Sequence, residues 1–125
     1  MALIQATPTQ TDLFMVRGTD INILVTSENT SGVAQDITND SVTFTARKGI
    51  AGTVLLEQTN ASGQHTAPAS GTTTFTIADT ETETSDFSAY ESTILHYEVR
   101  RIFQAGEEVV YLSGLLRVTA TPTPS

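Results

Sequence analysis

Four acidic residues between positions 79 and 86 are the side chains of this sequence best placed to hold a metal ion. Asp79, Glu81, Glu83 and Asp86 offer carboxylate oxygens at nearly alternate positions, and oxygen is the ligand atom that Ca²⁺ takes. A calcium-binding loop also needs a glycine at its sixth position and a glutamate at its twelfth, where this sequence has Tyr90. The pattern therefore favours a solvated acidic loop over a metal site.

The two histidines, His65 and His96, are the remaining candidates for acid–base chemistry. One falls in an expected loop and the other on the polar side of an expected strand, and no cysteine or serine motif stands beside either. Hydrogen-bonded or exposed histidines are the better interpretation. The sequence thus predicts no catalytic residue, no metal and no cofactor.

Two pairs of basic residues are candidates for binding anions or acidic partners. Arg47 and Lys48 precede Gly49, and strand-end solubility explains them better than an anion site does. Arg100 and Arg101 lie in an expected strand, where pairing with acids of a neighbouring subunit is as good an explanation as solubility.

Charge and composition limit the class of protein. Fourteen acids against six bases give a net charge of −8 in 125 residues, which opposes binding to nucleic acid and favours solubility or a basic partner surface. There is no cysteine, so disulfides and thiolate metal sites are excluded. No apolar run approaches the roughly 20 residues that span a bilayer. We expect one domain that does not enter a membrane and is made in a cytoplasm.

A long hairpin at the end of the sequence organises these residues. From Thr93 onward, Leu95, Tyr97 and Val99 alternate with polar residues, as in a half-buried strand. A glycine-containing turn at 104–107 leads into a second arm over 109–119. Its inward set is predicted to be Val110, Leu112, Leu116 and Val118.

Five shorter strands are expected before this hairpin, and turn-forming residues separate them. A single helical turn capped by Thr80 and Glu83 is expected in the acidic segment. Residues 1–11 form an N-terminal arm, 12–119 the domain and 120–125 a C-terminal tail. Seven strands and no amphipathic helix predict an all-β, antiparallel two-sheet sandwich. The five strands are expected at 12–17, 21–26, 41–48, 53–58 and 71–78.

The order of several segments resembles the immunoglobulin-like domain of phage virion proteins, in particular the N-terminal domain of siphophage baseplate upper proteins. The resemblance covers roughly residues 12–119 and consists of strand patterns and turn residues. It is carried by DITNDSVTFTARKG (36–49), VLLEQT (54–59), GTTTFTIADTET (71–82), YESTILHYEV (90–99) and YLSGLLRV (111–118). It implies an immunoglobulin-like β-sandwich that assembles with copies of itself and docks on other virion proteins.

From the sequence, we expect no helical or receptor-platform region after the sandwich, in contrast to the baseplate proteins. The resemblance therefore implies a non-enzymatic capsid decoration (cement) protein that binds the shell in many copies, within a virion assembled in the host cytoplasm. A tail, baseplate or fibre accessory protein, bound to a tail protein instead of the major capsid protein, is the first alternative. A carbohydrate-binding or adhesion module is the second, and a chain without tryptophan disfavours it. A hydrolase is the weakest.

The last expected strand is apolar on both sides, which predicts an interface. Val109, Tyr111 and Leu115 fill the register opposite the inward set, and only one side of a strand can point to the core of a sandwich. We predict that part of this second set, with Arg100 or Arg101 at its polar rim, lies between copies of the protein in a homotrimer.

Overall fold

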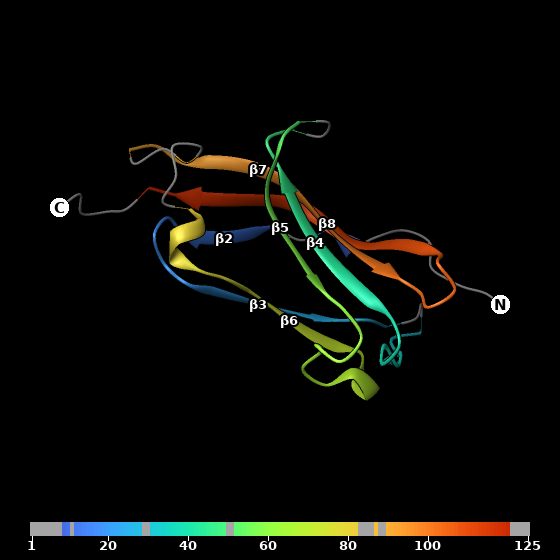
Figure 1. Ribbon diagram of the computed structural model, residues 1–125. Helices are drawn as coiled ribbons and strands as arrows, with labels where there is room; N and C mark the ends of the chain where they lie inside the picture. The colour runs from blue at the N-terminus through green and yellow to red at the C-terminus, as the bar shows by residue number, and fades with distance from the viewer. Residues whose placement is uncertain are drawn as a thin grey trace.

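The computed structural model describes residues 9–10, 12–28, 31–49, 52–82, 87 and 90–120, and they form a two-layer arrangement of strands (Figure 1). All seven expected strands are present, and the all-β, sandwich-like fold is confirmed. The elements are β1 (Thr9–Gln10), β2 (Leu13–Val16), β3 (Ile21–Thr26), β4 (Ser41–Arg47), β5 (Val54–Asn60), η1 (Pro68–Ser70), β6 (Thr72–Ile77), η2 (Asp79–Glu81), β7 (Thr93–Ile102) and β8 (Glu108–Thr119), where η marks a 3₁₀ turn.

The large sheet is built around the β7–β8 hairpin, as the sequence predicts. Its order is β1-β8-β7-β4-β5, and β2 also pairs with β8, following β1 along the same edge. The second sheet contains only β3 and β6, which pair in antiparallel fashion from Ile21↔Ile77 to Thr26↔Thr72. In Figure 1 these two strands run together below β2, β7 and β8.

The N-terminal edge differs from the prediction in two ways. β2 and β8 pair in parallel, from Leu13↔Leu116 to Val16↔Thr119, whereas an antiparallel sandwich was expected. Two parallel neighbouring strands need a long connection, and here almost the whole sequence of the domain lies between β2 and β8. The end of the predicted arm, β1, also pairs with β8 through Thr9↔Leu112. The other residues of the arm, and 121–125 of the tail, lie outside the described residues.

The core lies between the two sheets, and the predicted inward side chains lie in it or pack against it, with the exception of Val110. Phe44 of β4 is fully buried, and its ring centroid is 5.9 Å from that of Phe75 and 5.8 Å from that of Tyr97. Three strands of two sheets thus meet at one aromatic cluster, and its ring centroids are separated by distances typical of aromatic pairs. The residues around it are Met15, Ile23, Val25, Ile37, Val42, Ala46, Leu56, Ile77, Phe87, Leu95, Val99, Leu116 and Val118.

A bulge in β8 overturns part of the predicted register. Val99 pairs with Leu112 but Arg100 pairs with Val110, so Tyr111 is an extra residue in β8. The extra residue exchanges the two faces of the strand beyond it. Val110, predicted to point inward, therefore shares the outer face with Arg100, and Val109, predicted to point outward, shares the face of Arg101.

Side chains of β5 close one side of the sandwich. Asn60 donates to the carbonyl of Thr74 (2.8 Å) and to the hydroxyl of Thr73 (2.7 Å), and the backbone N–H of Thr76 donates to Gln58 (3.0 Å). The side-chain amides of Asn60 and Gln58 thereby form hydrogen bonds with backbone groups at the open edge of β6. Without them, these backbone groups would be exposed to water or to another strand.

Gly71 joins three loops where no other residue fits. Its φ is +74°, and a Cβ built there would lie 2.5 Å from the carbonyl oxygen of Gln35 and 2.7 Å from that of Ser27. Its own carbonyl accepts the N–H of Ser27 (2.8 Å). Glycine is required here both for its left-handed backbone and for the close approach of the neighbouring chain.

Candidate interaction surface on the large sheet

The outer face of the large sheet, which points away from β3 and β6, carries two rows of paired residues across its strands. Directly paired residues of neighbouring strands point to the same face. The first row joins Phe14 of β2, Arg117 of β8 and Ile94 of β7. The second row joins Leu115 of β8, His96 of β7, Arg47 of β4 and Val54 of β5. We call these seven residues the outer patch.

The apolar side chains of the outer patch are exposed to solvent. Phe14 is 64% exposed, Ile94 45% and Val54 39%, while Leu115 is half-buried. Other large exposed apolar residues, such as Leu24 of β3, Val33 and Tyr90, lie on the small sheet or in loops. Single exposed apolar residues are ordinary, but a group of them across several strands marks a surface that binds something.

The side chains of two arginines of the outer patch have no partner among the described residues. The guanidinium groups of Arg47 and Arg117 make no hydrogen bond or ion pair with any part of the chain that the structure describes. Two exposed acids, Asp12 and Glu57, stand at opposite margins of the patch, one before β2 and the other in β5. Arginine and aromatic residues among apolar neighbours are typical of protein interfaces.

A small hollow lies at the β2 end of the patch. It is lined by Asp12, Leu13, Phe14, Ile94, Leu115 and Arg117, and its empty volume is about 230 Å³, including space open to solvent. Pockets for small organic ligands usually measure 300 to 1,000 Å³. The carboxylate of Asp12 is partly used, because it accepts the N–H of Leu115 (3.2 Å) and so fastens the start of β2 to β8.

Arg100, predicted for the rim of an interface, lies on the outer face outside the patch. It donates to Glu98 (2.6 Å) and Glu108 (2.9 Å), and 40% of its side chain is exposed. The hydrogen bond to Glu108, with help from Glu98, raises the pKa of Arg100 above its ordinary value. Because the two glutamates balance the charge of Arg100 within the chain, Arg100 interacts less strongly with an acidic group of a partner.

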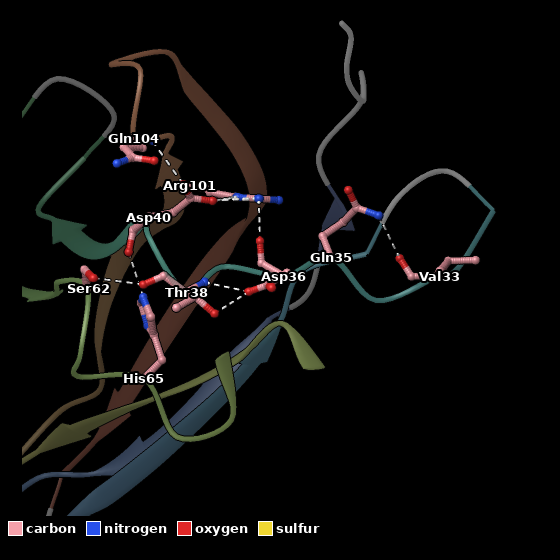
Figure 2. A network of polar contacts seen from close by, with 9 residues as sticks. All are labelled: Val33, Gln35, Asp36, Thr38, Asp40, Ser62, His65, Arg101 and Gln104. Atoms are coloured by element: carbon pink, nitrogen blue, oxygen red, sulfur yellow. Dashed lines mark hydrogen bonds and ion pairs between the residues drawn. The ribbon is translucent and has the colours of Figure 1, made fainter. Parts of the chain in front are cut away.

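Arg101 points to the other side of the sheet and belongs to a polar network at one end of the sandwich (Figure 2). It forms an ion pair with Asp40 (2.6 Å) in which the two side chains are only 11% and 9% exposed. Asp40 also accepts the backbone N–H of Gln104 (3.0 Å), and the guanidinium lies 4.3 Å from the ring centroid of Phe103. Arg101 therefore ties the β7–β8 turn to the loop before β4.

The same network fixes the loops on either side of it, as Figure 2 shows. The carboxylate of Asp36 accepts the N–H of Thr38 (2.8 Å) and its hydroxyl proton, and these hydrogen bonds lower the pKa of Asp36. His65 Nε2 lies 2.7 Å from the backbone carbonyl of Asp40. Since a carbonyl only accepts, Nε2 carries the proton. His65 thus has a structural position, in agreement with the sequence interpretation.

The predicted interface residues are not brought together. Leu115 belongs to the outer patch, Val109 is half-buried on the face of Arg101, and the side chain of Tyr111 lies outside what the structure describes. Sequence reasoning missed Phe14, Val54, Ile94 and Arg117. Each of these residues alternates with an inward neighbour in its strand, so the sequence did contain the signal for an outer face. The prediction, however, considered a second apolar face for β8 alone.

The structure describes only some residues of the acidic segment, which the sequence offered as a candidate metal site. Glu83 and Asp86 lie outside the described residues, while Glu81 accepts the N–H of Ala78 (2.9 Å), so the helical turn begins before the predicted Thr80. Within the described ranges, no group of three or more His, Cys, Asp or Glu side chains is placed to hold a metal ion. Nor does any helix in those ranges have the length and apolar character needed to cross a membrane.

Arg47 and Lys48 turn out to differ in their surroundings. Arg47 is half-buried in the outer patch, whereas Lys48 is exposed at the turn that follows β4. His96 lies beside Arg47 and Leu115 in the second row. Together the geometry describes a surface suited to binding a macromolecule. Comparison of the chain with protein-family models and with curated proteins finds no match.

Proposed function

We propose that this protein is a non-enzymatic structural protein of a phage virion, a capsid decoration (cement) protein that binds the assembled shell in many copies. The observation that carries the proposal is the outer patch, where apolar side chains and arginines that are exposed or half-buried lie together across five strands. A surface of this composition is suited to permanent contacts between proteins, and a decoration protein makes such contacts with its own copies as well as with the shell.

The strand arrangement supports the resemblance on which the virion assignment rests. In immunoglobulin domains, strands C, F and G form one sheet, while B and E belong to the other. Here β4, β7 and β8 are neighbours in the large sheet, and β3 and β6 form the small one. With β2 counted as the first strand, β3, β4, β6, β7 and β8 correspond to B, C, E, F and G, whereas β2 and β5 belong to the large sheet.

The test is to look for the protein in the parent particle. We expect mass spectrometry of purified virions to find it in many copies per particle, and electron microscopy to place density of this size at symmetry-related positions on the shell. Density on the tail would favour the tail, baseplate or fibre accessory function instead. Absence from purified virions would exclude both functions.

One observation favours carbohydrate binding as a second candidate. Phe14 offers an exposed aromatic face beside Asp12 and Arg117 in the hollow, and sugars stack on aromatic rings while polar groups bind their hydroxyls. Saturable binding on a glycan array that Phe14→Ala abolishes would support this function. Binding that Phe14→Ala leaves unchanged would not involve the hollow.

A further inference from the structure

We propose that two copies of this protein pack against each other through the outer patch, face to face. The inference deepens the proposed function, because it rests on a protein that works in several copies and says how they pair. It replaces the predicted trimer, whose interface residues the fold does not bring together, by a dimer with two-fold symmetry.

The distribution of charge selects this face. The chain has a net charge of −8, so copies repel one another over most of their surface. The outer face of the large sheet carries three arginines against four acids, a net charge of −1. Among the other described residues, eight acids and three bases lie elsewhere and carry −5. The seven charged residues on this face are Asp12, Arg47, Glu57, Glu98, Arg100, Glu108 and Arg117.

The apolar residues select the same face for both partners. The outer patch groups Phe14, Ile94, Leu115 and Val54, whereas Leu24 is exposed on the small sheet beside paired threonines. A second copy therefore buries most apolar surface when it presents the same patch. An interface that uses one surface on both copies is closed by a two-fold axis and yields a dimer.

The two margins of the patch are complementary in such a pair. Asp12 stands at the β2 margin, level with Leu115, and Arg47 lies on β4 towards the β5 margin at the same level. A two-fold axis that runs along the strands between β7 and β8 keeps this level and places the β2 margin of one copy over β4 of the other. Arg47 of each copy then faces Asp12 of the other, so a guanidinium without a partner among the described residues finds a carboxylate in the second copy.

The first experiment measures mass by light scattering and sedimentation over a range of protein concentrations. We expect twice 13.3 kDa for the wild type and a dissociation constant raised at least about 30-fold in Phe14→Ser/Ile94→Ser. Leu24→Ser, which removes an equally exposed apolar residue from the small sheet, is the matched control and should stay dimeric. Circular dichroism melts establish that each variant is folded.

The second experiment reverses charges across the proposed interface. Arg47→Glu should weaken the dimer, and Arg47→Glu/Asp12→Arg should restore it, because the two charges of the pair are only exchanged. A monomeric wild type, a trimer, a folded Phe14→Ser/Ile94→Ser variant that still dimerises, or a folded double charge variant that dimerises more weakly than Arg47→Glu would each overturn the pairing. A monomer found on virions overturns the pairing alone, and a dimer absent from virions overturns the proposed function alone.

Discussion

At the scale of single residues, neighbouring arginines of one strand have opposite roles. Arg100 is exposed on the outer face between two glutamates, while Arg101 is nearly buried with one aspartate. Exposed ion pairs add little to stability, because water and salt screen them. Removing one partner of a buried pair is costly, because the other charge stays buried without compensation.

We therefore predict that Arg101→Ala lowers the free energy of unfolding by about 3 to 5 kcal/mol, and Arg100→Ala by less than about 1 kcal/mol. Urea denaturation followed by circular dichroism measures both. Similar losses in the two variants would mean that the ion pair with Asp40 is not the anchor of the β7–β8 turn.

At the scale of elements, the sequence predicts the positions of the strands better than it predicts which side of each strand faces the core. Alternation identified all seven strands, because an inward residue at every second position is a local property. The bulge at Tyr111 was missed, since one extra residue in β8 is visible only against its partner strand β7. The same limit applies to the outer patch, whose seven residues come from five strands and become neighbours only through the sheet order.

The bulge predicts which of two nearby residues tolerates change. Leu112 packs against the core, so we expect Leu112→Ala to cost about 2 kcal/mol of unfolding free energy. Val110 lies on the outer face, and Val110→Ala should cost less than about 1 kcal/mol. Chemical denaturation compares the two variants. The reverse order would show that β8 continues without a change of face, as its sequence alone suggests.

At the scale of the whole molecule, the aromatic cluster makes stability sensitive to alkali. Burial, with a smaller contribution from the charge of Asp12, raises the pKa of Tyr97 to about 12. An unfolded tyrosine loses its proton near pH 10. Tyr97 therefore contributes its full stabilisation below pH 10, and the contribution is lost as the pH rises towards 12.

We expect the unfolding free energy to fall by about 1.4 kcal/mol per pH unit between pH 10 and 12 because of this residue. Denaturation curves at several alkaline pH values measure the slope, and Tyr97→Phe is the comparison, since it keeps the ring and removes the ionisable group. An equal slope in Tyr97→Phe would assign the alkaline sensitivity to other groups.

The parallel pairing of β2 with β8 also governs how the protein folds. The contact between Asp12 and Leu115 joins residues 103 positions apart, and the whole β2–β8 ladder spans similar separations. Contacts so distant along the chain slow the search for the native topology, so this domain should fold slowly for its size. During synthesis, β2 cannot pair until the last strand, β8, has left the ribosome. Until then Phe14 and Met15 have no partner strand, and repulsion between the net charges of nascent chains is what opposes their aggregation.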